Sequence, residues 1–352
     1  KNKMNFNYNK IKKNNFPYVI AEIGVNHECS VATAKRLILL AKKGGAHAAK
    51  FQTYTAEKLA KVNSRAYWDI SKEKTKSQFE LFSKFDKFKP KDYRGLARFC
   101  RKNKIDFLST PFDLDSVKML KPLVQAFKIS SSDITNYPLL EEISKTKKPS
   151  IISTGASTLD EIRNAVKILK KGSNKIVIMH CILNYPTQDK DANLSMITSL
   201  KNEFPKYIIG YSDHTLPNSG MINLTSAFIL GAKVIEKHFT HNKKFKGNDH
   251  YHSMDASDLK HLSENLKKII KILGTNKQKK VIKSELKSRK FARRSIVAKR
   301  NLKKNSIIRE KDLITLRPNV GIPANFWKKV IGRKIKRNLK ANSSIRWKDL
   351  RI

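Results

Sequence analysis

The sequence predicts an α/β protein, a (β/α)8 TIM barrel followed by a small β-rich domain. Three observations support this prediction. Short apolar runs of strand length recur along the chain, helical patterns separate them, and polar residues stand at the ends of the runs. A doubly wound open sheet would give a similar alternation, but the eight runs match the number of strands in a barrel.

The eight apolar runs are the predicted strands. Each is short, and the segment that follows it has the character of a helix rather than of a tight turn, which is typical of parallel strands. In chain order the runs are "YVIAEIG" (18–24), "AAKFQT" (48–53), "DFLSTPF" (106–112), "AFKISS" (126–131), "PSIIST" (149–154), "IVIMHC" (176–181), "YIIGYSDH" (207–214) and "KVIEKHF" (233–239).

Helices with recognisable ends fill the segments between the runs. Thr158 and Glu161 have the spacing of a capping box, and Gly172 is placed to end the same helix. Ser30 is the expected cap of an earlier helix that ends in two glycines. A third pattern, 257–274, places leucines and isoleucines on one stripe. Strand and helix therefore alternate through most of the chain.

Polar side chains gather where the predicted strands end. Barrel enzymes build their sites from the C-terminal ends of the strands and from the loops that follow, so these residues are expected to converge on one mouth. A solvated strand tip would explain any one of them, but it explains the whole series poorly. The residues are Glu22, Asn26, Lys50, Gln52, Thr110, Lys128, Ser130, Ser131, Ser153, His180, Asp213, His214, Glu236 and His238.

Two lysines of this set suit an anionic ligand. Lys50 and Lys128, with the hydroxyl groups of Thr110, Ser131 and Ser153, could hold a small dianion that carries a phosphate ester and a carboxylate. The alternative is that the lysines form buried ion pairs with acidic residues at neighbouring strand ends.

Two histidines of the set suit a metal. His214 and His238 follow neighbouring strands and could be imidazole ligands of an open divalent metal site, with water or substrate completing the shell. Either histidine alone would more often be a hydrogen-bonded core residue, and it is their pairing that favours the metal.

The chain is strongly basic, with 74 Lys and Arg against 29 Asp and Glu in 352 residues and a net charge of +45. Such a charge attracts anions, from phosphorylated metabolites to nucleic acid or a bilayer surface. Because the lysines are spread over the whole chain, a background preference for lysine explains the charge at least as well. A basic nucleic-acid-binding protein is the alternative from another class, although the sequence lacks an aromatic platform or a recognition-helix motif.

The sequence predicts a cytoplasmic protein without a membrane partner. Cys29, Cys100 and Cys181 have neither CxxC spacing nor a disulfide framework, which favours a reducing compartment and a role as small core residues. No apolar run approaches the ~20 residues of a transmembrane helix, and the N-terminal segment lacks the apolar middle of a signal peptide.

Two segments stand outside the regular alternation. The stretch 53–104 is longer than an ordinary crossover, and its aromatic residues could form a lid over the mouth or, more simply, pack on the barrel. The basic stretch 276–291 is the predicted linker between a barrel domain at 1–275 and the small β-rich domain at 292–352.

In this order the motifs resemble the sialic acid synthases, also called N-acetylneuraminate or nonulosonic acid synthases. The C-terminal segments "ARRSIVAKRNLKKNSIIREKDLITLRPNVGI" and "IGRKIKRNLKANSSIRWKDL" resemble the small antifreeze-like (SAF, β-clip) domain that follows the barrel in that family. The resemblance extends from about Phe16 to Leu350. The barrel motifs that carry it are "AEIGVNH", "KFQT", "STPFD", "FKISSSD", "NYPLL", "ISTG", "HCILNYPT", "GYSDHT" and "IEKHFT".

The resemblance implies a condensation of phosphoenolpyruvate with an N-acylated hexosamine, such as N-acetylmannosamine, to give a nine-carbon 2-keto acid and phosphate. Legionaminate and pseudaminate synthases, and N-acylneuraminate-9-phosphate synthases that use a 6-phosphorylated sugar, share the motifs and are alternatives. A related 2-keto-3-deoxy acid synthase is a further alternative, which the C-terminal domain argues against.

The resemblance also implies roles for residues of the barrel. Glu22 and Glu236 match acidic residues of the reaction centre. His214 and His238 match the ligands of a divalent metal, usually Mn²⁺, with Mg²⁺ or Co²⁺ as substitutes. The residues that match positions around phosphoenolpyruvate are Lys50, Gln52, Thr110, Lys128, Ser131, Ser153 and Tyr185, and we expect Lys128 to take part in catalysis.

Two further residues match positions at the sugar end of the site. Asp249 matches a residue that contacts the sugar. Arg317 matches an arginine that the C-terminal domain of the partner subunit delivers to the site, so that the resemblance implies a domain-swapped homodimer.

The chain departs from the family pattern at two positions. Leu183 stands where family members often carry asparagine, with Asn184 one place later, and Asp133 stands where many carry glutamate. Both positions lie where the acyl-sugar would be discriminated. They leave the reaction unaffected and the identity of the sugar open.

Overall fold

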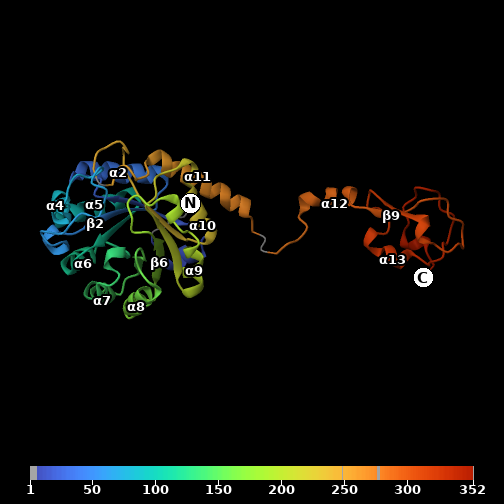
Figure 1. Ribbon diagram of the computed structural model, residues 1–352, viewed down its shortest axis with the longest axis horizontal. Helices are drawn as coiled ribbons and strands as arrows, with labels where there is room; N and C mark the ends of the chain where they lie inside the picture. Colours follow the sequence, from blue (N-terminus) through green and yellow to red (C-terminus); the bar gives the residue numbers. More distant parts are fainter. Residues whose placement is uncertain (1–5, 248, 276–277, 352) are drawn as a thin grey trace. The chain divides into compact units, whose positions relative to one another are not determined.

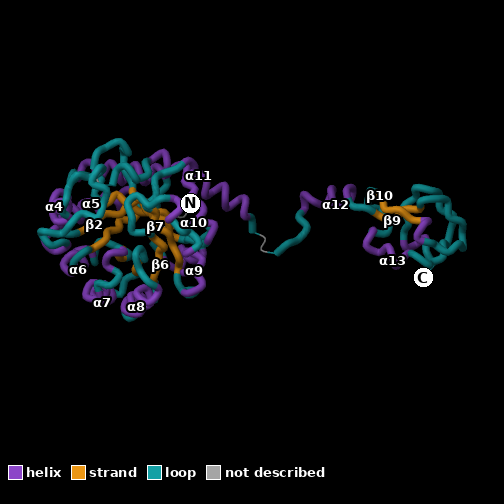
Figure 2. The backbone as a smooth tube through the Cα atoms, in the orientation of Figure 1, coloured by secondary structure: helices purple, strands orange, loops and turns teal. Residues whose placement is uncertain are grey.

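The structure, a computed structural model, describes residues 6–247, 249–275 and 278–351. The chain divides into two compact units, 1–274 and 275–352, and each is described by itself. In the first unit the strands stand at the centre with helices around them, and in the second unit loops predominate (Figures 1 and 2).

Eight parallel strands form the sheet of the first unit, in the order β3-β2-β1-β8-β7-β6-β5-β4. The end strands β3 and β4 also contact each other, so that the sheet is nearly closed into a barrel. The predicted (β/α)8 fold is confirmed. The strands are β1 Tyr18–Gly24, β2 Ala48–Thr53, β3 Asp106–Pro111, β4 Phe127–Ile129, β5 Ser150–Ser153, β6 Ile176–Cys181, β7 Ile208–Asp213 and β8 Val234–His238.

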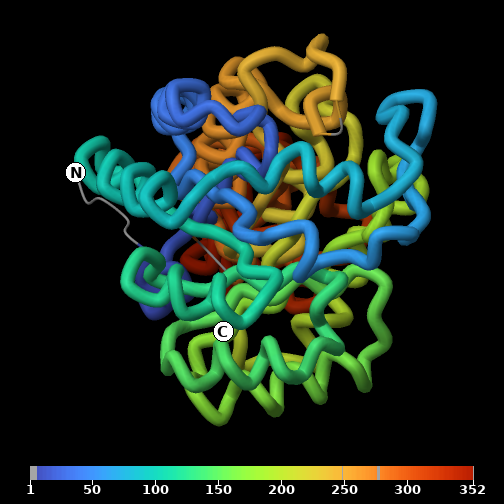
Figure 3. Tube along the Cα trace, turned by 90° about the vertical axis from the view of Figure 1, so that its left-hand side faces the viewer, coloured from blue at the N-terminus to red at the C-terminus, as the bar shows by residue number. Residues whose placement is uncertain are grey.

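A helix follows every strand, and the succession of strands and helices can be followed by colour around the first unit (Figure 3). Apolar faces of these helices and the outer faces of the strands share one large core. The helices are α2 Val31–Gly44, α5 Pro90–Asn103, α6 Leu114–Leu120, α7 Tyr137–Lys145, α8 Leu159–Lys170, α9 Met196–Glu203, α10 Ile222–Leu230 and α11 Ala256–Leu273, with the short α3 Ala56–Leu59 and α4 Gln78–Phe85 preceding α5.

The helix ends agree closely with the capping pattern, with one instructive difference. Thr158 and Glu161 form the expected capping box of α8, and Ser30 caps α2. Helix α8 ends before Gly172, and a Cβ at this glycine would lie 1.8 Å from the carbonyl oxygen of Ser144. Gly172 is therefore required by close packing against the end of α7.

A short N-terminal helix closes the barrel at the end opposite the strand C-termini. Phe6 and helix α1 (Tyr8–Lys13) share a core cluster with inward-facing strand residues such as Tyr18, Leu108 and Val177. The sequence pattern does not predict this helix, because most of its side chains are polar and only a few apolar residues enter the core.

The second unit contains a two-stranded antiparallel sheet of β9 (Ser295–Ala298) and β10 (Leu313–Leu316). The predicted β-rich character of this region is confirmed. It is also a repeat, since "RNLKKNSIIREKDL" and "RNLKANSSIRWKDL" differ at few positions and have equivalent ion pairs, Arg300 with Asp312 and Arg337 with Asp349. Two further helices are α12 (Leu286–Ala292) and α13 (Trp327–Val330).

The stretch predicted as a linker is partly helical. It includes most of α12, and residues 276–277 of the stretch lie outside the described part of the chain. Among the helices that the structure describes, none combines the length and the apolar character that a membrane span requires.

Candidate active site

Strand alternation decides which strand-end residues face the inside of the barrel. In β8, Glu236 and His238 line an inner cavity, while Lys237 between them pairs with Asp213 of β7 and is buried on the outer side. The neighbouring β7 residue Ser212 faces inward, and its hydroxyl donates to Glu236 Oε1 over 3.1 Å.

Two strand residues that were predicted at the mouth therefore face away from it. Asp213 binds Lys237, and His180 Nε2 lies 2.8 Å from the carbonyl oxygen of Ala192 with its ring stacked on Tyr211. Both side chains point outward because successive residues of a strand face opposite sides and their neighbours face inward. The position of a residue near a strand end does not by itself show which way it faces.

Two buried lysines and two buried glutamates form the centre of the site. Lys50 Nζ lies 2.7 Å from Glu22 Oε2 and 3.7 Å from Glu236 Oε1, and it donates to Thr110 Oγ1 over 3.2 Å. Lys128 Nζ lies 3.2 Å from the same Glu236 oxygen. All four charged side chains are at most 5% exposed.

The two lysines differ in electrostatic environment. Burial lowers the pKa of Lys50, but the carboxylates of Glu22 and Glu236 outweigh burial and raise this pKa above its ordinary value. Burial lowers the pKa of Lys128 by more than Glu236 restores it. Burial alone would raise the pKa of Glu236, but the ammonium groups of Lys128 and Lys50 hold it below its usual range. Lys128 is thus the lysine whose charge has the less complete compensation.

Polar atoms without a partner remain beside these charges. Among the described residues, Ser153 Oγ and Glu236 Oε2 are buried and have no hydrogen-bond partner. The hydroxyl of Ser131 accepts from the backbone amide of Gly155 over 2.9 Å. A buried polar group without a partner costs ~1–3 kcal/mol, so that a ligand or water is expected to occupy this space.

These side chains surround a small cavity of about 50 Å³ at the barrel mouth. The cavity brings together most of the residues proposed from the sequence, because strands far apart in the chain end side by side. Its lining includes Glu22, Lys50, Gln52, Thr110, Lys128, Ser131, Ser153, Tyr185, His214, Glu236 and His238.

The two predicted metal ligands line this cavity, with ring centroids 5.7 Å apart. His214 Nδ1 lies 2.8 Å from the carbonyl oxygen of Ile182, which can only accept, so Nδ1 carries the proton and Nε2 the lone pair. Burial lowers the pKa of His214 to about 3, which keeps the imidazole neutral. His214 can thus offer Nε2 to a metal, and with the buried ring of His238 beside it the pair fits an open metal site.

The residues that the structure describes contain no cluster of three or more His, Cys, Asp or Glu side chains arranged to hold a metal ion. His238 Nδ1 lies 3.4 Å from Asp249 Oδ2, and on its other side Asp249 Oδ1 lies 3.5 Å from His252 Nε2. Burial opposes the charge of His238, but Asp249 outweighs burial and raises its pKa. The remaining ligands of a metal at the two imidazoles would therefore come from water or substrate.

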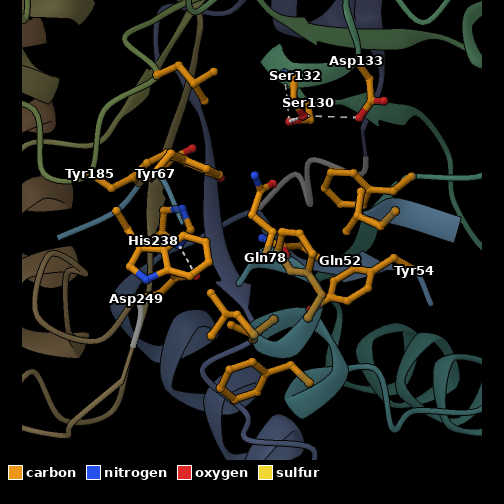
Figure 4. A pocket seen from close by; sticks show the side chains of 18 residues that line it. Gln52, Tyr54, Tyr67, Gln78, Ser130, Ser132, Asp133, Tyr185, His238 and Asp249 are labelled. Carbon is orange, nitrogen blue, oxygen red and sulfur yellow. Dashed lines mark hydrogen bonds and ion pairs between the residues drawn. The ribbon is translucent and has the colours of Figure 1, made fainter. Parts of the chain in front are cut away.

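A larger cavity of about 360 Å³ adjoins the small one and shares Gln52, Tyr185 and His238 with it. Figure 4 shows Ser130, Ser132 and Asp133 on one side of this cavity and Tyr185, Tyr67, His238 and Asp249 on the other. Residues of the long β2 to α5 segment, including Tyr67, Trp68, Phe82 and Phe85, complete the wall. The aromatics of this segment thus line a cavity as well as packing on the barrel.

Three residues near the site had no assigned role in the sequence analysis. Cys181, expected to be a core residue, lines the small cavity, and burial raises the pKa of its thiol to about 11. Ser212 binds Glu236, and His252 stands 4.9 Å from the His238 ring, centroid to centroid. Strand alternation would have identified the first two, whereas His252 lies in an irregular loop without such a signal.

Arg317 lies in the second unit, where its side chain is exposed. Of the three free cysteines, Cys100 and Cys181 are buried and Cys29 is half-buried.

Comparison with known proteins identifies the family. Residues 37–278 match the NeuB family and residues 293–351 match the SAF domain. The chain is 39% identical over 321 residues to an N,N'-diacetyllegionaminic acid synthase of Campylobacter jejuni, covering 90% of this chain and 94% of the relative. It is 37% identical over 326 residues to the enzyme of that name from Legionella pneumophila, covering 90% of each.

A solved structure supports the same assignment. The N-acetylneuraminic acid synthetase of Leptospira borgpetersenii superposes with a TM-score of 0.69 at 34% identity, covering 78% of this chain and 90% of that one. With matches of this extent in both sequence and structure, the chain belongs to the NeuB family and carries a C-terminal SAF domain.

Proposed function

We propose that this protein is a nonulosonic acid synthase, an enzyme that condenses phosphoenolpyruvate with the open-chain aldehyde form of an N-acylated hexosamine. The observation that carries the proposal is the small cavity, in which two buried lysines stand beside hydroxyl groups and two imidazoles. The relatives, which are named as synthases of such acids, support the same reaction.

Phosphoenolpyruvate would occupy the small cavity. Its carboxylate and phosphate need cationic and hydroxyl partners, which Lys50, Lys128, Ser131 and Ser153 provide. Ser153 Oγ, which has no hydrogen-bond partner among the described residues, would then gain one. The lysines also screen the charge of the ligand while the reaction proceeds.

The reaction balances with this set of residues. The C3 carbon of phosphoenolpyruvate bonds to the aldehyde carbon, and the aldehyde oxygen takes up a proton. Water then bonds to C2 and loses one proton. The bond between C2 and the bridging oxygen breaks as the new hydroxyl becomes the C2 carbonyl, and phosphate leaves with the bridging oxygen and the second proton. Glu22, at 2.7 Å from Lys50 Nζ and 3.3 Å from Gln52 Nε2, is placed to accept the proton of the water.

A divalent metal, most commonly Mn²⁺ in this family with Mg²⁺ or Co²⁺ as substitutes, would be held by His214 and His238. When bound, it would supply Lewis-acid polarisation of the aldehyde. Tyr185 packs against the His214 ring at 4.2 Å between centroids and would restrict the orientation of that imidazole. Asp249, in contact with His238, would face the sugar from the larger cavity.

A domain-swapped homodimer would complete the site. Its basis is the match of Arg317 to a family arginine, and the exposed side chain leaves the guanidinium available to a second copy of the chain. Arg317→Ala is then expected to weaken use of the sugar more than binding of phosphoenolpyruvate. Equal losses for both substrates would contradict this role.

The test is phosphate release from phosphoenolpyruvate with Mn²⁺ and a panel of N-acylated hexosamines, with and without a chelator. The expected result is chelator-sensitive release with at least one sugar and a nine-carbon keto acid by mass spectrometry. In ¹⁸O water the label should appear in the oxygen on C2 of the product and be absent from the phosphate. Folded, metal-loaded protein that releases no phosphate with any sugar would contradict the proposal.

A further inference from the structure

The larger cavity has a lining whose charge is opposite to that of the chain as a whole. The chain carries +45, yet no lysine or arginine occurs among the described residues that line this cavity. Its charged lining groups are Asp133 and Asp249, with His238 beside them. The sequence left open whether the basic composition indicates a phosphorylated sugar, and the structure shows that the positive charge is not gathered in this cavity.

Both carboxylates are buried, at 8% exposure for Asp133 and 6% for Asp249. Asp133 Oδ1 accepts a single strong hydrogen bond, from Asn136 over 3.0 Å, and Asp249 faces the two imidazoles. Asp133 has no cationic partner among the described residues, and Asp249 is paired only with imidazoles. Buried carboxylates in such surroundings disfavour a phosphate dianion and accept hydrogen bonds from N–H and O–H groups, so they favour an uncharged ligand with donors.

Much of the remaining wall is apolar and aromatic. Tyr54, Phe82, Phe85, Phe112 and Leu183 contribute to it, and Phe82 and Phe112 both pack against the ring of Tyr54 at 5.5 and 5.8 Å between centroids. A hydroxyl or phosphate placed against such a wall loses water without gaining a partner, whereas a methyl group is favoured there.

We propose that the sugar acceptor is an uncharged 6-deoxyhexose bearing two acylamido groups, in preference to an N-acetylhexosamine or its 6-phosphate. This rests on the proposed function, because the cavity adjoins the phosphoenolpyruvate site. Three methyl groups, one at C6 and one in each acetyl group, suit the apolar wall. Two amide N–H groups suit the carboxylates, and the amide carbonyls suit donors such as Gln78 and Ser132.

Phe82 and Leu183 are then specificity-determining residues. Leu183 stands where the family often has asparagine, and it lines the cavity together with Asp133, the other departure from the family pattern. Phe82 belongs to α4, in the long segment between β2 and β3. Both departures from the family pattern and the long segment between β2 and β3 thus contribute to the wall of one cavity, which would select the sugar.

The test compares kcat/KM for 2,4-diacetamido-2,4,6-trideoxyhexoses, N-acetylmannosamine and N-acetylmannosamine 6-phosphate, with saturating phosphoenolpyruvate and Mn²⁺. The diacetamido sugar is expected to be preferred by ~10-fold or more, the scale on which apolar pockets discriminate. Equal or better use of either other sugar overturns the inference. Preference for the 6-phosphate that disappears in Arg317→Ala would overturn it by locating a cation outside this cavity.

Direct binding separates this inference from the proposed reaction. Titration calorimetry of the same sugars, with phosphoenolpyruvate absent, should rank the diacetamido sugar first whether or not turnover follows. Tightest binding of that sugar without any phosphate release would sustain the inference and contradict the proposed function. Turnover of N-acetylmannosamine or its 6-phosphate with a kcat/KM equal to or above that of the diacetamido sugar would sustain the proposed function and overturn the inference.

Matched variants locate the preference. Phe82→Ala and Leu183→Ala should each lower kcat/KM for the diacetamido sugar by ~10-fold or more relative to N-acetylmannosamine. Phe99→Ala is the control, because Phe99 is also half-buried but packs on the outer core beside Lys35 and is absent from the cavity lining. Equal losses for every sugar in Phe82→Ala, or an equal change of preference in Phe99→Ala, would overturn the assignment.

Discussion

The barrel sheet carries two buried clusters of lysine and carboxylate, one on each face, and β8 contributes to both. On the outer face, Lys237 Nζ lies 2.8 Å from Asp213 Oδ2. Asp213 Oδ1 accepts from the hydroxyls of Tyr211 and Thr215 and from the Thr215 amide, while the carbonyl oxygen of Thr215 accepts from Lys237. Every polar atom of this outer cluster has a partner.

The inner cluster of Lys50, Lys128, Glu22 and Glu236 also combines lysines with carboxylates, but its hydrogen bonding is less complete. Glu236 Oε2 is buried and without a hydrogen bond among the described residues, and Lys128 has one carboxylate partner for three donor hydrogens. The inner cluster faces a cavity and the outer cluster faces protein. Incomplete hydrogen bonding beside a cavity, rather than burial of charge, therefore distinguishes a ligand site from a structural ion pair.

The outer cluster should control stability. Lys237→Met leaves Asp213 as an uncompensated buried charge, and breaking a buried pair in this way costs ~3–5 kcal/mol. Urea unfolding is the measurement, with turnover measured on the folded fraction, which should remain near that of the parent. A large loss of turnover per folded molecule would instead show that Lys237 takes part in the reaction.

The inner cluster should control activity. Lys128→Met removes a cation that would contact the anionic substrate, and the loss of one such charge-stabilising group costs ~10²–10³ in kcat. Stability should change by less than ~1 kcal/mol, because Lys50 still faces Glu236 and the burial cost of one charge disappears. Lys118→Met, which changes an exposed lysine, is the matched control and should alter neither property. A stability loss as large as that of Lys237→Met would make the inner cluster structural.

Two buried serines, one at the cavity and one away from it, should differ in the same way with smaller effects on stability and KM. Ser153→Ala removes a buried hydroxyl for which the described part of the chain provides no hydrogen-bond partner, so stability should be unchanged or raised by up to ~1 kcal/mol while KM for phosphoenolpyruvate rises. Ser109→Ala removes a buried hydroxyl that is 2.7 Å from Thr53 Oγ1, and it should lower stability by ~1 kcal/mol without changing KM. Identical behaviour of the two variants would contradict the distinction.

Acid should remove the contribution of the outer cluster to the stability of the fold, over a pH range set by Asp213. Burial raises the pKa of Asp213, but Lys237 outweighs burial and lowers it below the value of an unfolded aspartate, about 3.9. Folding then releases a proton in this window, so the stabilising contribution is present above pH ~4 and is lost as pH falls through the folded pKa. The free energy of unfolding between pH 5 and pH 3 should fall less steeply in Asp213→Asn than in the parent. Equal slopes would show that Asp213 does not contribute.

Much of the fold could be predicted because apolar runs and capping residues are local signals. The limits of β1, β2 and β6 coincide with the predicted runs, and Thr158 and Ser30 cap the helices expected of them. Helix α1 could not be predicted in this way, since its role depends on where the chain folds back into the barrel.

The candidate site could likewise be predicted only where the sequence carries a local signal. Lys50 and Glu236 stand near the ends of apolar runs and face inward, so the positions of the runs predict them. The same positions also predict Asp213 and His180, which strand alternation turns outward. His252 lies within an irregular loop whose path has no local signal in the sequence. The sugar cavity required the structure, because its wall combines α4 with loops from distant strands.

The most direct test of the distinction between the two clusters is the shift in melting temperature that phosphoenolpyruvate produces in three proteins. A ligand that binds only the folded state stabilises it by ~2.7 kcal/mol at one hundred times its Kd, so binding is read without turnover. We expect a clear upward shift in the parent protein, the same shift from a lower starting temperature in Lys237→Met, and little or no shift in Lys128→Met. A full shift in Lys128→Met together with a lost shift in Lys237→Met would contradict this expectation.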